Sequence, residues 1–375
     1  PPPLFNETAT TEIYTYTESS AASDVYKRQN INDGQWHHVV GVMDATTVYL
    51  YVDGVEVDSN PHSVTLSDTA DPLTFGSSNG WASTEYEGLL DEVSVYGRAL
   101  SPAEVAGMYS QPPLVVNSTD DDADASIGNG VCDTGQTNAA GVPECTLRAA
   151  IEEANAVGSV DTIYFDIPQA DSGYSASPLS WTITPTAAYD DIVQTVVIDA
   201  TTQPGFSGDP IIQLDGSDPG AAGATAALTL EANNSLIEGF IVHSWADEGL
   251  EIDASTGAGD NNTLRNNWVG IDAGENVQSI GDVGILLTVG AGGNTVIGNV
   301  VGGATTAGIL IRNAGSDNNT VIGNYIGVGP DGATPAANSG EGISIDDAAS
   351  GNIIGGTTGG AGNISANSCS DGIDV

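Results

Sequence analysis

Residues 294–311 read Asn-Thr-Val-Ile-Gly-Asn-Val-Val-Gly-Gly-Ala-Thr-Thr-Ala-Gly-Ile-Leu-Ile, and they contain two short phrases that recur along the chain. The first phrase is an Asn followed by a short aliphatic run, and it recurs at Asn234, Asn262, Asn294, Asn319 and Asn352. The second is a Gly followed by aliphatic residues, at Gly249, Gly284, Gly308, Gly342 and Gly372. The Asn anchors are 28, 32, 25 and 33 residues apart. Repeats of roughly 20–45 residues indicate a solenoid, in which each repeat buries its apolar face against its neighbours.

Each repeat predicts one coil of two or three short strands, with Gly and Asn at the turns between them. Stacking of the coils would align Ile and Val in interior ladders, and it would let turn asparagines bond one another's side-chain amides. The expected Asn stack comprises Asn261, Asn262, Asn294, Asn318 and Asn319. The preference of turns for Asn then accounts for the three Asn-x-Ser/Thr sequons of this region, and glycosylation is not needed to explain them.

Residues 145–156 predict the clearest helix of the chain, with Leu147, Ile151 and Ala154 on one face and Thr146 as the N-cap. The run Cys145-Thr146-Leu147-Arg148-Ala149-Ala150 resembles the motif of the CSLREA family of exported bacterial proteins. Residues 196–206 and 210–216 resemble the first coils of that family.

The resemblance implies a right-handed parallel β-helix of pectin-lyase-like fold over residues 114–375, with the helix covering its open N-terminal end. Family members carry Ser and Glu where this chain has Thr146 and Ala149. The departure removes the Glu of a capping box and weakens the predicted helix start. Because the chain stops within an apparent strand, we expect the solenoid to continue beyond Val375.

Residues 30–110 predict a different β domain. The strand Val48–Val52 runs directly into Asp53-Gly54 and then into Val55–Val57, which is a strong hairpin signal. These residues, together with 34–39, 88–96 and 98–104, resemble the laminin-G-like, concanavalin A-like jelly roll.

The chain is therefore expected to be all-β: a jelly-roll β-sandwich, a linker at 111–113, and a β-helix solenoid with a capping helix. The jelly-roll fold hosts lectins, adhesion modules and inert spacers. Within the first domain, Trp81 lies in a loop-like Ser/Asn/Gly stretch and is the candidate for stacking on a sugar.

Residues 24–29, Asp-Val-Tyr-Lys-Arg-Gln, contain the only lysine of the chain and resemble a translated sequencing adaptor. We expect an assembly scar there, with residues 1–29 of uncertain origin. The alternative is an ordinary basic surface turn.

The charge of the chain excludes one class of partner. Six basic residues face 50 acidic ones, for a formal net charge of −44, which disfavours binding to phosphate backbones and hence to nucleic acid. The same charge attracts Ca²⁺, or serves only to keep an extracellular protein soluble. Asp120, Asp121, Asp122 and Asp124 are the candidate Ca²⁺ ligands, and a solvated loop is the alternative. No apolar run is long enough to span a membrane.

Cysteine usage points to an oxidising compartment. Cys132 and Cys145 enclose a 12-residue, Gly-containing stretch ahead of the predicted helix, and we expect them to form a disulfide. Cys369 is expected to be free, or paired outside these residues. Localisation is accordingly predicted as extracellular or at a bacterial cell surface, with signal and anchor outside the sequence given.

The sequence favours a binder over an enzyme. The most site-like cluster is His243, Trp245, Asp247 and Glu248, whose aromatic and acidic groups suit a carbohydrate, with Ca²⁺ binding, catalysis or a plain loop as alternatives. A polyuronate lyase needs a strong base near its substrate. Arg265 and Arg312 fall at different phases of the coil, so we expect them on different faces and no shared clamp.

We therefore predict an exported cell-surface or extracellular structural or adhesive protein that binds carbohydrate or Ca²⁺ and has a glycan or cell-surface ligand as partner. The alternative is a polysaccharide-active enzyme, a lyase or glycosidase of pectin-lyase fold.

Overall fold

The structure is a computed structural model, and it describes residues 37–44, 46–61, 99–102, 105, 113–156, 161–218, 220 and 226–375. The chain divides into two units, 1–111 and 112–375. The division falls at the Pro-rich stretch 111–113. Trp81 and residues 24–29 lie outside the described residues.

The described part of the first unit is an antiparallel sheet of β1 (Val39–Met43), β2 (Thr47–Val52) and β3 (Val55–Pro61), in that order. The predicted hairpin between β2 and β3 is confirmed. Asp53 and Gly54 have φ values of 51° and 72°, which is the left-handed pair that a tight type I′ turn requires. The carboxylate of Asp53 also accepts hydrogen bonds from the backbone N–H of His38 (3.1 Å) and pairs with Nδ1 of His37 (2.8 Å).

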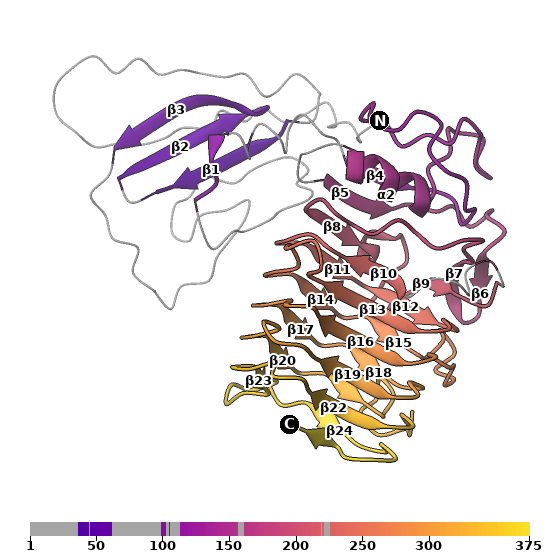
Figure 1. The fold of residues 1–375 in the computed structure, drawn as a ribbon. Helices are drawn as coiled ribbons and strands as arrows, with labels where there is room; N and C mark the ends of the chain where they lie inside the picture. Colours follow the sequence, from indigo (N-terminus) through magenta and orange to yellow (C-terminus); the bar gives the residue numbers. More distant parts are fainter. Residues whose placement is uncertain are drawn as a thin grey trace, which may run out of the picture. The chain divides into compact units, whose positions relative to one another are not determined.

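The second unit is a parallel β-helix whose strands form three sheets in the described residues (Figure 1). Each strand pairs in parallel with the equivalent strand one coil away, apart from the antiparallel β6–β7 pair. Sheet one contains β4 (Leu114–Val116), β5 (Asp161–Phe165), β8 (Val196–Asp199), β11 (Leu236–Glu238), β14 (Thr263–Arg265), β17 (Thr295–Ile297), β20 (Thr320–Ile322) and β23 (Ile353–Ile354). Sheet two contains β6 (Tyr174–Ala176), β7 (Leu179–Ile183), β9 (Ile212–Asp215), β12 (Phe240–His243), β15 (Trp268–Val269), β18 (Val300–Val301), β21 (Tyr325–Ile326) and β24 (Ile364–Ser365). Sheet three contains β10 (Ala226–Leu230), β13 (Glu248–Asp253), β16 (Val283–Thr288), β19 (Ala307–Ile311), β22 (Glu341–Ile345) and β25 (Ile373–Asp374).

From β11 onward every coil supplies one strand to each sheet, which confirms the repeat seen in the sequence. Leu250, Ile285, Ile309 and Ile343 are register partners on successive strands of sheet three, and none of them has any exposed surface. Aliphatic ladders of this kind exclude water along the whole stack, so the continuous core is the main stabilising term.

The turns into sheet one are joined by a ladder of buried asparagines. The side-chain Oδ1 of Asn262 accepts from the backbone N–H of Ser235 (2.8 Å), and Oδ1 of Asn294 accepts from that of Asn262 (2.7 Å). In the next coils, Oδ1 of Asn319 accepts from the backbone N–H of Asn294, and Oδ1 of Asn352 accepts from that of Asn319, both at 2.8 Å. Ser235 therefore occupies the ladder position in the first of these coils, one residue after the expected anchor Asn234. The step from Ser235 to Asn262 is therefore 27 residues. The bonds of this ladder run from a backbone N–H to a side-chain Oδ1, and not between two side-chain amides as expected.

A second ladder, which the sequence reading missed, lies at the turn between sheets one and two. Oδ1 of Asn299 accepts from the backbone N–H and the Nδ2 of Asn267, and its Nδ2 donates to the carbonyl of Leu264 (2.9 Å). Asn324 and Asn363 repeat these contacts in the next coils. The signal was present, because an Asn stands five residues after Asn262, Asn294 and Asn319.

The residue before each rung of the first ladder has a left-handed backbone: Asn234, Asn261, Gly293, Asn318 and Gly351, with φ between 57° and 67°. Gly and Asn are the residues that tolerate this conformation. Backbone geometry thus explains the paired Asn residues.

The predicted helix is confirmed as α2 (Leu147–Ala156), which lies beside β4 and β5 at the N-terminal end of the stack (Figure 1). The Thr146 hydroxyl accepts from the Ala149 N–H (3.1 Å), so Thr146 is the N-cap. Ala149 is fully buried, so a Glu at this position would have to place its carboxylate out of contact with water.

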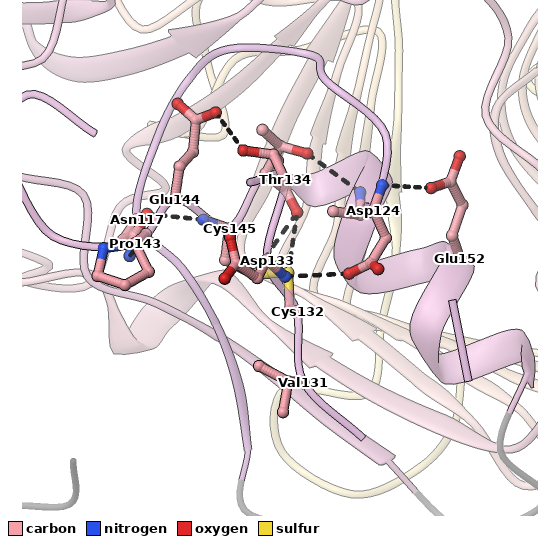
Figure 2. The surroundings of a disulfide bond; sticks show 12 residues. Asn117, Asp124, Val131, Cys132, Asp133, Thr134, Pro143, Glu144, Cys145 and Glu152 are labelled. Atoms are coloured by element: carbon pink, nitrogen blue, oxygen red, sulfur yellow. Dashed lines mark hydrogen bonds between the residues drawn. A yellow bond between two sulfur atoms is a disulfide. The ribbon is translucent and has the colours of Figure 1, made fainter. Parts of the chain in front are cut away.

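The predicted disulfide between Cys132 and Cys145 is present, with the two Cα atoms 5.3 Å apart. Figure 2 shows how it ties the segment before α2 to the start of the helix. Around it, the backbone N–H of Asp124 donates to Glu152 of α2 (2.7 Å), and the N–H of Cys145 donates to Asn117 (3.0 Å). The bridge therefore closes a cap that hydrogen bonds already organise. Cys369 is free and exposed.

Replacing Asn299 by Ala should lower the free energy of unfolding by about 3 kcal/mol, because the Asn267 N–H and the Leu264 carbonyl lose their partners in a buried turn. Urea unfolding measures the change. The control, Asn129→Ala, removes one bond from the Val131 N–H (2.7 Å) at the surface, where water can replace it, and should cost less than about 1 kcal/mol. Equal effects of the two substitutions would show that the ladder carries no stability.

Replacing both Cys132 and Cys145 by Ala should cost about 2–3 kcal/mol under oxidising conditions, as expected for a short closed loop. Thermal and urea unfolding with and without reductant give the comparison: reductant should destabilise the wild type and leave the double variant unchanged. Cys369→Ala is the control and should behave as the wild type. A double variant as stable as the oxidised wild type would contradict the account of the cap.

Candidate functional site

The expected cluster of His243, Trp245, Asp247 and Glu248 lies at one corner of the β-helix, between β12 and β13. His243 ends β12 and Glu248 begins β13, and residues 244–247 connect them. Ser244 has a φ of 63°, so the chain turns sharply directly after His243. The turn separates the four side chains into three environments.

His243 belongs to sheet two and faces the preceding coil. Its Nδ1 lies 2.9 Å from the Ser244 hydroxyl and 3.5 Å from a carboxylate oxygen of Asp215, its register partner on β9. Only 7% of its surface is exposed. Burial lowers the pKa of His243, although Asp215 and Asp272 oppose the shift, so the ring is held mainly neutral.

Trp245 is a core residue and offers no face to a sugar, which corrects its expected role as a platform. It is 1% exposed, and its indole packs where any side chain at Gly216 would collide with it: a Cβ there would lie 2.7 Å from the ring. Glycine at 216 thus lets the indole enter the core.

Asp247 and Glu248 are joined by Asp282, a residue that the sequence reading missed. One carboxylate oxygen from each lies within 4.8 Å of the others. The backbone N–H of Asp282 donates to the carbonyl of Asp247 (2.8 Å), so the two aspartates stand at equivalent corners of successive coils. We call Asp247, Glu248 and Asp282 the acidic corner. A signal for it existed, since Asp247 and Asp282 each stand two residues before a recurrent Gly, at 249 and 284.

Glu248 is the most constrained member of the acidic corner. It is 5% exposed, and its Oε2 is buried without a hydrogen-bond partner. Burial raises its pKa to about 7, and the negative charges of Asp247, Glu251 and Asp282 add to the shift. The negative charges around Glu248 are therefore not balanced by a positive group among the causes of its pKa shift.

Glu251 lies farther along β13 in a second acidic group. Burial raises its pKa to about 7, and Asp253 and Asp191 add to the shift. A hydrogen bond from Thr229 (3.4 Å) and the charge of Arg312 act in the opposite direction. Glu251 is thus another carboxyl group whose neutral form the fold favours.

In the Asp120–Asp124 run, which was expected to bind Ca²⁺, the side chains of Asp121, Asp122 and Asp124 each bond to a different partner near the capping helix. Asp121 pairs with Arg148 (2.9 Å) and accepts from the Thr186 N–H. Asp122 accepts from Gln136. Asp124 accepts from the Asp133 N–H (Figure 2). Within the described parts of the chain, the acidic corner is the set of three His, Cys or acidic side chains whose ligand atoms converge, and these aspartates do not form one.

Asp120 lines a shallow hollow of about 510 Å³ beside the cap. Its walls are polar, with hydroxyls from Thr119, Ser172, Thr182, Thr184 and Thr186. Burial raises the pKa of Asp120, and Glu144, Asp171 and Asp122 contribute to the shift. None of the described residues that line this hollow is aromatic, so they offer no stacking platform.

The two arginines of the solenoid body lie on different sheets, as their phases in the coil predicted. Arg265 ends β14 in sheet one and pairs with Glu238. Arg312 directly follows β19 in sheet three. They therefore do not share a groove.

Comparison with known proteins assigns the first unit. Residues 4–106 match the family model of the concanavalin A-like lectin/glucanases superfamily, of the laminin-G type, so the chain contains a concanavalin A-like domain. The match begins ahead of the expected boundary at residue 30 and runs across residues 24–29. No curated protein matches the chain.

The domain type and the disulfide are both typical of extracellular proteins. Among the described residues, no helix has the length and apolarity needed to cross a bilayer.

Glu251→Gln should flatten the pH dependence of stability. The folded-state pKa of Glu251, about 7, lies above its ordinary value of 4.5. Its contribution to the free energy of unfolding is therefore full below about pH 4.5 and is lost as the pH rises through 7. Urea unfolding at pH 5 and pH 8 in chelator-treated buffer should show a smaller loss for Glu251→Gln than for the wild type. The exposed control Glu275→Gln should lose as much as the wild type. An unchanged pH dependence in Glu251→Gln would refute the assignment.

Proposed function

We propose that the chain is part of an exported structural or adhesive protein that contacts carbohydrate through its concanavalin A-like domain, with the β-helix in a structural role. The observation that carries the proposal is the match of residues 4–106 to a lectin/glucanase superfamily. The superfamily supports a carbohydrate-binding or structural role and leaves the ligand open.

Three features support export to a cell surface or the extracellular space. The Cys132–Cys145 bridge needs an oxidising compartment to persist. The net charge of −44 keeps a protein soluble and repels nucleic acid. The sequence around α2 resembles the CSLREA motif of exported bacterial β-helix proteins, and α2 lies beside β4 and β5 at the N-terminal end of the stack.

In this proposal the β-helix has a structural role and does not contact the glycan. Its aliphatic ladders and its two Asn ladders use the repeated residues for packing and backbone satisfaction. Trp245 is buried and His243 is nearly so, which removes the aromatic and the basic member from the sugar site expected at this corner. We therefore assign glycan contact to the first unit, with Trp81 as its stacking residue.

A glycan array probed with the labelled chain, residues 1–375, tests the proposal. The wild type should bind a defined set of glycans without degrading them, and Trp81→Ala should weaken binding at least tenfold. Trp245→Phe is the control, because a buried indole that touches no ligand leaves glycan affinity unchanged when the core tolerates the replacement.

Two results would count against the proposal. Absence of binding across the array would leave the first unit without its assigned role. Release of reducing ends or of unsaturated products from polysaccharides would favour the alternative, a polysaccharide-active enzyme.

A further inference from the structure

We propose that the acidic corner formed by Asp247, Glu248 and Asp282 is a Ca²⁺ site that links two successive coils of the β-helix. The inference concerns the second unit and does not rest on the proposed glycan binding. It differs from the site expected in the Asp120–Asp124 run, whose side chains do not converge.

The geometry of the corner fits one ion. Three carboxylate oxygens, one from each residue, lie within 4.8 Å of one another. Oxygens that bind a single Ca²⁺ at about 2.4 Å are at most about 4.8 Å apart, and the three carboxylate oxygens of the corner meet this requirement. A backbone hydrogen bond (2.8 Å) fixes Asp247 and Asp282 relative to each other. Both residues are only partly buried, so water can supply the remaining ligands of a bound ion.

The second observation is the state of Glu248. Only 5% of the surface of Glu248 is exposed, and its Oε2 is buried with no hydrogen-bond partner. A buried carboxylate without a partner is costly, and its cost is removed by a cation or by protonation. None of the ion pairs formed by the described arginines and histidines includes a residue of the corner.

The ligand set selects the kind of cation. All three groups are carboxylates, without a histidine or cysteine, which disfavours Zn²⁺ and favours a hard cation. Ca²⁺ accepts 6–8 oxygen ligands in flexible geometry, whereas Mg²⁺ requires a near-ideal octahedron and retains several waters. Ca²⁺ is therefore the better match for three carboxylates on an irregular turn.

The ion would act as a staple between coils. Asp247 and Glu248 belong to the coil that contains β13, and Asp282 belongs to the next coil, directly before β16. An ion bound to both coils replaces repulsion between stacked like charges by attraction to a shared cation. Ca²⁺ should thus stabilise the folded solenoid, because the unfolded chain cannot bring the three groups together.

Isothermal titration calorimetry with CaCl₂ at about 0.15 M NaCl tests the site, since added salt suppresses diffuse binding to exposed carboxylates. The chelator-treated wild type should bind Ca²⁺ at one site that is at least tenfold weaker in Glu248→Gln and in Asp282→Asn. Glu275→Gln removes the same charge from an exposed turn and should bind as the wild type does. Both corner variants should fold, because each removes a negative charge from a crowded group.

Thermal unfolding provides the second readout. Ca²⁺ should raise the Tm of the wild type and of Glu275→Gln, and the rise at the same Ca²⁺ concentration should be clearly smaller in both corner variants. Identical Ca²⁺ affinity and an identical Tm shift in all four proteins would overturn the proposal, as would a wild type that binds no Ca²⁺. A failure of glycan binding has no bearing on either readout, so the two proposals fail independently.

Discussion

In the strands of this β-helix, neighbouring coils are joined by backbone hydrogen bonds, and at two of the turns a backbone N–H donates instead to the side chain of an Asn in the next coil. The ladder through Asn262, Asn294, Asn319 and Asn352 and the ladder through Asn267, Asn299, Asn324 and Asn363 apply this solution at two of the turns. A buried amide without a partner costs on the order of 1–3 kcal/mol, so each rung fixes where the next coil must lie. The aliphatic ladders of the core then follow from the same register.

The same register places equivalent side chains of successive coils next to one another, at the spacing of about 4.8 Å between strands. For Ile285 and Ile309 this is favourable, because stacked aliphatic groups exclude water together. For Asp247 and Asp282 it is unfavourable, because like charges are held close. A chain with 50 acidic residues and few basic ones accumulates such positions, and in the acidic corner burial and neighbouring negative charges together raise the pKa of Glu248. The proposed Ca²⁺ site thus follows from regular stacking applied to an acidic sequence.

Features that depend on local sequence or on the repeat period were predicted correctly. These include the Asp53-Gly54 hairpin, the Thr146 N-cap, the Cys132–Cys145 bridge and the parallel coils. The chemistry of the corner was not predictable in the same way. Strand alternation indicates which way a side chain points only while the strand continues, and the left-handed Ser244 interrupts it. Trp245 consequently points into the core. Asp282, which stands 35 residues after Asp247 in the sequence, lies next to Asp247 in the structure. The ladder position at Ser235 was misplaced by one residue because Asn is also favoured at the left-handed position before it.

Hydrogen–deuterium exchange of the second unit tests most directly whether the Asn ladders set the register of the stack. If they do, the backbone amides of Asn267, Asn299 and Asn324, each donating to the Asn of the next coil, open only when the solenoid unfolds. Their exchange should then be among the slowest in the protein and should accelerate with low concentrations of urea in parallel with global unfolding. Exchange of these amides as fast as in the exposed residues 357–360 would contradict the account, because the ladder bonds would then be dispensable to the folded coil.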